Sequence, residues 1–225
     1  VLVRRLYFDL VGMPPSPDEV DAFVNDPSPY AWELLIDTLL EDPRYGEHWA
    51  RFWLDLVRYA ESDGWNQDAY RSEIWRYRDY VVNALNEDKP YTEFVRQQIA
   101  GDEMAGDNPA NLIATGYLRL GIYEYNQRDA RSHWDDIMNE ITDVMGNAFL
   151  GLSMSCSRCH DHKFDPLMQT DYFSLRAFFE PLTWRDDIPG ATAEARAAWQ
   201  EQQTAWEEAT ASVRAEIDAL ITPYH

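Results

Sequence analysis

The segment Cys156-Ser157-Arg158-Cys159-His160 constrains the chain most strongly, because it holds both cysteines and places a histidine directly after the second. Cys-x-x-Cys-His is the attachment sequence of c-type haem. The two intervening residues space the thiols for addition to the two vinyl groups as thioethers, and the next imidazole falls beneath the iron. The motif therefore predicts one covalent haem c, with Cys156 and Cys159 as its anchors and His160 as the metal ligand.

Three other chemistries remain open for the same residues. A redox-active Cys-x-x-Cys normally follows a strand in a βαβ unit, and no strand pattern precedes this one. A disulfide across two residues closes too short a loop to stabilise a fold by much. A zinc site is formally available from Cys156, Cys159, His160 and His162, although structural zinc sites usually separate their ligand pairs by many more residues.

Composition fits a sizeable globular chain and excludes some partners. The 225 residues are 45% hydrophobic and 14% aromatic, which is enough for a substantial core. A net charge of −21 without any basic stripe argues against nucleic acid and leaves room for a basic protein partner. No apolar run is long enough to span a bilayer. Because the first residues already lie inside an amphipathic pattern, we expect a fragment of a longer protein, whose missing leader says nothing of location.

Hydrophobic periodicity predicts an all-α fold, an irregular multi-helix domain around the haem. Apolar residues recur at helical spacing, and no stretch alternates for long enough to form a strand. The expected helices cover about 17–25, 29–41, 44–61, 72–87, 92–100, 111–120, 129–150 and 171–179. Ser16 followed by Pro17 has the pattern of a helix N-cap and first helical position.

The C-terminal tail differs in composition from the rest. Residues 184–190 have the composition of a linker, after which alanine, glutamate and glutamine dominate. Trp199, Trp206, Val213 and Leu220 recur every seven residues, a spacing typical of a coiled coil. We therefore expect a haem domain over 1–185 and a long helical arm over 191–222.

Four segments resemble the planctomycete-type cytochrome c-like domain of unknown function, the DUF1549 family, over roughly residues 1–182. They are RRLYFDLVGMPP at 4–15, WLDLVRYAESDG at 53–64, WRYRDYV at 75–81 and LGLSMSCSRCHDHKFDP at 150–166. The resemblance implies a secreted or periplasmic protein in which this domain lies beside a smaller cytochrome-like domain. Family members often carry a histidine at the position of Phe52, whereas this chain has His48 one turn earlier.

Further residues are expected near the haem. His162 follows the motif in a polar segment whose charged groups suit a propionate or a proton relay. Arg58 and Tyr59, which lie near Asp63 at an expected helix end, offer guanidinium and phenol donors of the kind that bind haem propionates. Without haem, the segment at His162 is explained as a solvated turn. The residues at Arg58 and Tyr59 are then explained as an ordinary ion pair at a helix end.

The ligand on the opposite face of the iron decides the function. The histidines and methionines that could reach the opposite face of the iron are His48, His133, Met138, Met145 and Met168. His133 is expected to face solvent because acidic residues flank it, and the methionines are expected in the core, which favours a site without a strong methionine ligand.

Electron transfer inside a larger extracytoplasmic protein is the first functional hypothesis, with a redox protein or an adjacent cytochrome-like domain as partner. The second is a haem-dependent redox enzyme with an open iron site, acting on a peroxide or a carbohydrate. The third is a zinc-stabilised interaction module.

Overall fold

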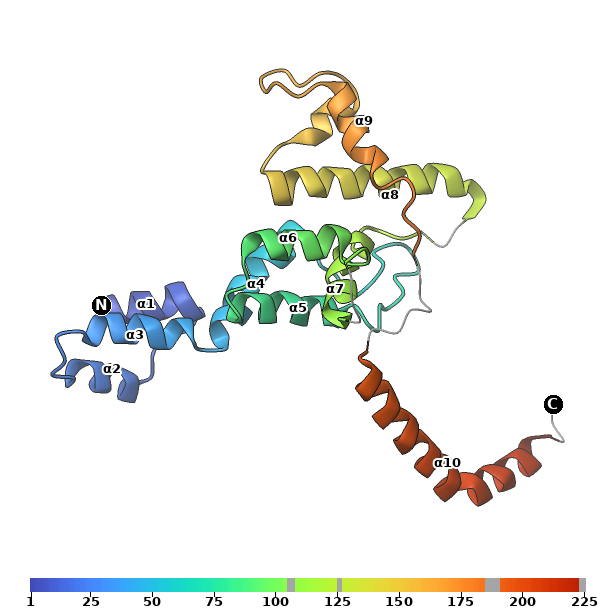
Figure 1. Ribbon diagram of the computed structural model, residues 1–225, viewed down its shortest axis with the longest axis horizontal. Helices are drawn as coiled ribbons and strands as arrows, with labels where there is room; N and C mark the ends of the chain where they lie inside the picture. Colours follow the sequence, from blue (N-terminus) through green and yellow to red (C-terminus); the bar gives the residue numbers. More distant parts are fainter. Residues whose placement is uncertain (105–107, 125–126, 185–190, 223–225) are drawn as a thin grey trace. The chain divides into compact units, whose positions relative to one another are not determined.

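The computed structural model describes residues 1–104, 108–124, 127–184 and 191–222, and these residues form helices, turns and loops with no strand (Figure 1). The predicted all-α class is confirmed for this part of the chain. The helices are α1 (Leu2–Val11), α2 (Pro17–Val24), α3 (Ala31–Leu40), α4 (Arg44–Leu56), α5 (Trp75–Asn86), α6 (Tyr91–Ala100), α7 (Pro109–Ala114), α8 (Ala130–Val144), α9 (Gln169–Ala177) and α10 (Ala193–Ile221).

The chain divides into two compact units, one formed by Val1–Met104 with Ala110–Asp186 and the other containing α10. The expected linker after residue 184 and the expected boundary at 185 fall on residues 185–190, which lie outside the described residues. Helix α10 begins at the N-cap Thr192, whose side chain accepts a hydrogen bond from the amide of Ala195, and it buries none of its residues. None of the described helices combines the length and the apolar character that crossing a membrane requires.

Local sequence signals account for the first helices. The Ser16 hydroxyl accepts a hydrogen bond from the Glu19 amide, and the Glu19 carboxylate accepts one from the Ser16 amide, so the predicted N-cap is a complete capping box. Gly12 ends α1 at a φ of 72°, a left-handed conformation that suits glycine. A small core joins α1 to α3, formed by Val3, Tyr7, Val11 and Leu39.

The main core lies between α4, α5, α6 and α8, with η1 (Thr115–Arg119) packed against α5 and α6. The apolar faces of α5 and α8 point into this core, where Tyr77, Val81, Ile137 and Ile141 are all buried. The expected helix 111–120 is shorter than predicted, because α7 tightens into the 3-10 segment η1 after Ala114.

Helix α4 ends five residues earlier than the predicted end at 61. Arg58 has a φ of 60°, and a left-handed residue other than glycine stops a right-handed helix. Arg58, Tyr59 and Asp63 therefore lie in the loop that follows α4 and not on its last turn. No glycine or proline occurs near residue 57 in the sequence, so the end of α4 could not be predicted from helix-breaking residues.

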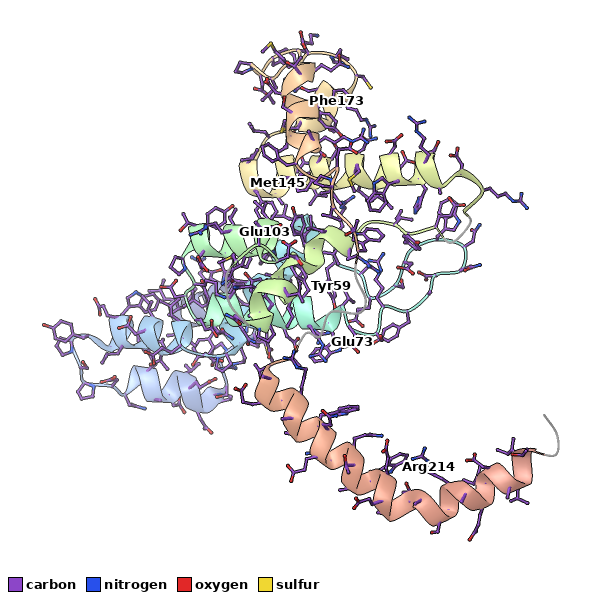
Figure 2. The ribbon with its side chains drawn as sticks, turned by 45° about the vertical axis from the view of Figure 1, so that its right-hand side comes forward. Tyr59, Glu73, Glu103, Met145, Phe173 and Arg214 are labelled. Atoms are coloured by element: carbon purple, nitrogen blue, oxygen red, sulfur yellow. The ribbon has the colours of Figure 1, made fainter. Side chains whose placement is uncertain are left out.

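The expected helix 129–150 is also interrupted. Helix α8 ends at Val144 and continues as a π-helical segment, η3 (Met145–Leu150), which ends at Gly151 with a φ of 65°. The 3-10 turn η4 (Met154–Arg158) follows and carries the first half of the Cys-x-x-Cys-His motif. Both α8 and α9 pack against η4. We call α8, η3, η4 and α9, with their connections, the motif lobe; Figure 2 labels Met145 and Phe173 on it.

Helix α4 packs against α5, and Gly46 of α4 lies in this contact. A Cβ atom at Gly46 would lie 2.5 Å from the carbonyl oxygen of Val82 and 2.6 Å from the Asn86 side chain, whose oxygen accepts a hydrogen bond from the Gly46 amide. We expect Gly46→Ala to lower the free energy of unfolding by about 1–3 kcal/mol in a urea titration, because the helices must separate.

Alanine otherwise favours helices over glycine by about 1 kcal/mol, so the direction of the change is diagnostic. Glu47→Ala, at the exposed neighbouring position, is the matched control and should leave the stability nearly unchanged. A Gly46→Ala protein as stable as the wild type would contradict the close approach of these two helices.

Candidate functional site

Both motif cysteines are free thiols on the surface of the motif lobe. Cys156 lies within η4 and Cys159 is its C-cap residue, and the Cys159 amide donates a weak hydrogen bond of 3.4 Å to the Cys156 carbonyl. One short turn thus presents two thiols to solvent three residues apart. Thiols in this arrangement are available for a covalent reaction with an external group.

Buried neighbours hold this turn in place. Ser157, between the cysteines, is fully buried, and its hydroxyl lies 3.4 Å from the carbonyl oxygen of Leu167. Met154 is 4% exposed and packs against Gly146 in η3, where an added Cβ atom would lie 2.9 Å from the Met154 Cγ atom. The motif therefore has a buried inner side and an exposed outer side that carries the two thiols.

His160 is exposed, and one of its ring nitrogens is already engaged. Its Nδ1 atom lies 2.8 Å from the carbonyl oxygen of Asp161. A carbonyl can only accept, so Nδ1 carries the proton and donates it, and the Nε2 lone pair is left open. A backbone carbonyl that fixes the tautomer and the ring in this way is typical of histidines that bind a metal.

The loop after the motif folds back on itself. The His162 amide donates to the Leu167 carbonyl at 2.8 Å, and the Asp161 carboxylate accepts from the Gln169 amide at 2.8 Å. The His162 Nδ1 atom accepts from the Asp165 amide at 2.8 Å, and the side chain is only 11% exposed. His162 therefore organises its own loop, and its role in binding a haem stays a prediction.

Arg58 and Tyr59 point to different partners. The Arg58 guanidinium binds the Glu140 carboxylate of α8, beside a small pocket with room for about one water molecule. The Tyr59 phenol, labelled in Figure 2, donates to Glu61 at 3.0 Å; burial, together with this carboxylate, raises the pKa of Tyr59 to about 12. Asp63 instead pairs with Arg71 at 2.6 Å. The three residues do not form one cluster.

A group that the sequence analysis missed connects Arg58 with the motif. The carboxyl of Asp143 interacts with the phenol of Tyr172, and the charges of Arg58 and Arg158 both act on it. Its Oδ1 atom is buried and has no hydrogen-bond partner among the described residues. Burial outweighs the arginines and raises the pKa of Asp143 above its usual value. The polar spacing of Asp135, Asn139 and Asp143 along one side of α8 was the signal available.

The candidate ligands for the opposite face of the iron differ in their exposure to solvent. Met138 is fully buried and Met145 is 8% exposed, as expected of core residues. Met168 is 54% exposed, so the expectation that it belongs to the core was wrong. His133 is half-buried and its Nε2 accepts a hydrogen bond from the Glu124 amide at 3.2 Å, so the expectation that it faces solvent was also wrong.

Other metal arrangements find little support. Among the residues that the structure describes, no three histidine, cysteine or acidic side chains converge as metal ligands, so the four candidate zinc ligands are not assembled. His48 contacts Arg51 at 3.2 Å and packs beside Gly12 of α1.

The chemistry of the donor set fits a covalent haem. Two free thiols and an imidazole with an open Nε2 supply the attachment and one axial ligand. The motif region also exposes large apolar side chains that an apolar macrocycle would cover, and burial of such surface contributes about 25 cal/mol per Å². They are Phe164, Met168, Phe173 and Phe178.

Comparison with known proteins gives one match. The family model described as PSCyt2, Protein of unknown function (DUF1549), matches residues 1–183. No curated protein and no solved structure matches the chain. The match includes the whole motif lobe and ends before α10.

The raised pKa of Asp143 gives a test of the geometry that needs no ligand. The folded-state pKa of this carboxyl lies above its unfolded-state value. Below the unfolded-state pKa the group is protonated in both states and has no effect on stability. As pH rises from there through the folded-state pKa, the free energy of unfolding falls. We expect Asp143→Asn to become progressively more stable relative to the wild type as pH rises from acidic to neutral, in urea titrations at each pH. Asp136→Asn, an exposed α8 control, should show no such trend, and a trend of opposite sign would place Asp143 in a solvated ion pair.

Proposed function

The chain belongs to the PSCyt2 family of proteins of unknown function (DUF1549), and from that premise we propose that it is a c-type haem-binding redox domain that transfers electrons within a larger extracytoplasmic protein. The observation that carries the proposal is the motif turn. It combines two exposed free thiols with an imidazole whose Nδ1–H donates a hydrogen bond to the Asp161 carbonyl. A redox disulfide explains the thiols and gives this histidine contact no role, and a zinc site would need a set of three or more converging ligands that the described residues do not form.

Cys156 and Cys159 are the residues that would hold the haem covalently. Each S–H bond would add across a vinyl double bond, so that a carbon–sulfur bond forms and the proton goes to the other vinyl carbon. No electron is exchanged in this addition. His160 would bind the iron through its Nε2 lone pair, and the carbonyl of Asp161 holds the ring with that atom open. The bound iron supplies one-electron redox chemistry.

The proposed location and partner follow from covalent haem attachment. Covalent attachment through two thiols requires a compartment where haem and reduced cysteines meet outside the cytoplasm, which supports a periplasmic or extracellular location. A single centre receives and passes on one electron at a time, so a redox protein or an adjacent cytochrome-like domain is the partner. The net charge of −21 favours a basic docking surface on that partner.

The exposure of Met168 favours electron transfer over catalysis at an open iron. Met168 precedes α9 on the motif lobe, and its amide donates to the Asp171 carboxylate at 2.8 Å. Its thioether is the exposed methionine sulfur that the motif lobe offers among the sixth-ligand candidates. A thioether ligand fills the coordination sphere and gives an electron carrier, whereas an empty position would serve the haem enzyme that is the alternative.

Covalent haem is the direct prediction. Protein produced in an oxidising compartment with a cytochrome c maturation system should gain the mass of one haem, and the gain should survive denaturation. Cys156→Ala or Cys159→Ala should leave the haem loosely held, and His160→Ala should alter the iron spectrum while the thioethers persist. An unmodified mass with bound zinc, or with a Cys156–Cys159 disulfide, would reject the proposal.

The sixth ligand separates electron transfer from the enzyme alternative. We expect the ferric protein to show the weak near-infrared band of a methionine–iron bond and to bind cyanide slowly. Met168→Ala should remove the band and speed cyanide binding at least tenfold, because the ligand no longer has to be displaced. Met13→Ala, at a distant exposed methionine, should change neither property. A wild-type protein that already binds cyanide as fast as Met168→Ala would favour the open-iron enzyme.

A further inference from the structure

Asp143 occupies a position that the redox role does not by itself require. It lies on the side of α8 that receives α9, where Arg176 binds Asp135 at 2.7 Å and the Tyr172 phenol donates to the Asn139 carbonyl at 3.3 Å. Asp143 is four residues beyond Asn139, one helical turn further along the same side. The carboxyl group thus lies where α8, α9 and the motif turn meet.

The groups around this carboxyl come from each element packed against it. Tyr172 interacts with it from α9, Arg158 acts on it from the motif turn, and Arg58 acts on it from the loop after α4. On α8 itself, Glu140 binds the Arg58 guanidinium and so neutralises part of that charge. Asp143 consequently faces two cations without an ion pair of its own among the described contacts.

The burial of Asp143 makes its charge costly. The Oδ1 atom is buried without a hydrogen-bond partner in the described structure, and an unsatisfied buried oxygen is less unfavourable when the group is neutral. The pKa of the carboxyl is raised for this reason despite the two arginines. A change in the surrounding charge shifts the same balance and therefore the protonation equilibrium of the carboxyl.

Reduction of a bound iron, which the proposed function requires, is a change in charge of this kind. Arg158 lies between the two cysteines that would anchor the haem and two residues before His160. We propose that Asp143, held against Tyr172, is a proton-binding site coupled to reduction of the iron, and this inference rests on the proposed function. When a one-electron donor protein reduces ferric iron to ferrous, Asp143 takes one proton from solvent; oxidation by the acceptor releases it.

The sign of the coupling follows from electrostatics. The motif turn η4 packs against α8, the helix that carries Asp143. Reduction of an iron held by that turn removes one positive charge from this side of the carboxylate, so the carboxylate is less stabilised and its proton affinity rises. Between the pKa of Asp143 in the ferric state and the higher pKa in the ferrous state, the reduction potential falls as pH rises. One proton per electron corresponds to a limiting slope of about 59 mV per pH unit, the value for a tenfold change in a one-electron equilibrium.

The test is a potentiometric titration of the full-length holoprotein at a series of pH values. The wild type should show a pH-dependent window, and Asp143→Asn should lose the slope in that window while it keeps its haem and its spectrum. Asp136→Asn removes an exposed carboxylate from the same helix and should keep the slope. A purely structural role for Asp143 would shift the potential of the variant by a constant amount and leave the slope in place, which would overturn the inference.

A second measurement reads Asp143 directly. The carboxyl of Asp143, observed by infrared or NMR with isotope labelling, should protonate at higher pH in the ferrous holoprotein than in the ferric holoprotein, and Tyr172→Phe should lower the pH at which it does so. Identical titrations in the two states would overturn the coupling even if haem is attached. Failure of haem attachment would overturn the proposed function and the coupling together, so the two failures are distinguishable.

Discussion

The packing of the motif turn against the end of α8 is the contact on which the candidate site depends. Met154 and Ser157 are buried against η3 and the loop after the motif, while the residues beside them, Cys156 and Cys159, remain exposed. A turn anchored from one side presents its other side without the freedom of an ordinary surface loop. The close approach of Gly146 to Met154 permits this arrangement, since a larger residue would push the turn outward.

The motif lobe combines two kinds of interaction that serve different purposes. Apolar packing places η4 on α8, whereas polar contacts hold α9 across α8 through Arg176 and Tyr172. Tyr172 is fully buried, and burial raises the pKa of its phenol, so the ring is a neutral donor over the whole physiological range. Polar groups at a packed helix interface fix the relative positions of the helices more specifically than apolar contacts do.

The π-helical segment η3 gives the junction of α8 with the motif its shape. A π-helical turn widens the helix, and such segments occur frequently at functional sites. Here η3 begins two residues after Asp143, and three residues separate its end from η4, so the irregular backbone lies next to both the proposed proton-binding group and the proposed attachment turn. One irregular stretch of chain thus connects the proposed redox site with the carboxyl proposed to respond to it.

The sequence by itself determined the helical class, the N-cap at Ser16 and the close spacing of Cys156, Cys159 and His160, because each depends on residues close together in the chain. Only the tertiary structure decided that α4 stops before Arg58, that Met168 is exposed and that Arg58 and Arg158 both act on Asp143. These features arise from segments distant in sequence, whose burial and charge depend on what packs beside them. Periodicity reports which residues share a helix face and cannot report which neighbour covers that face.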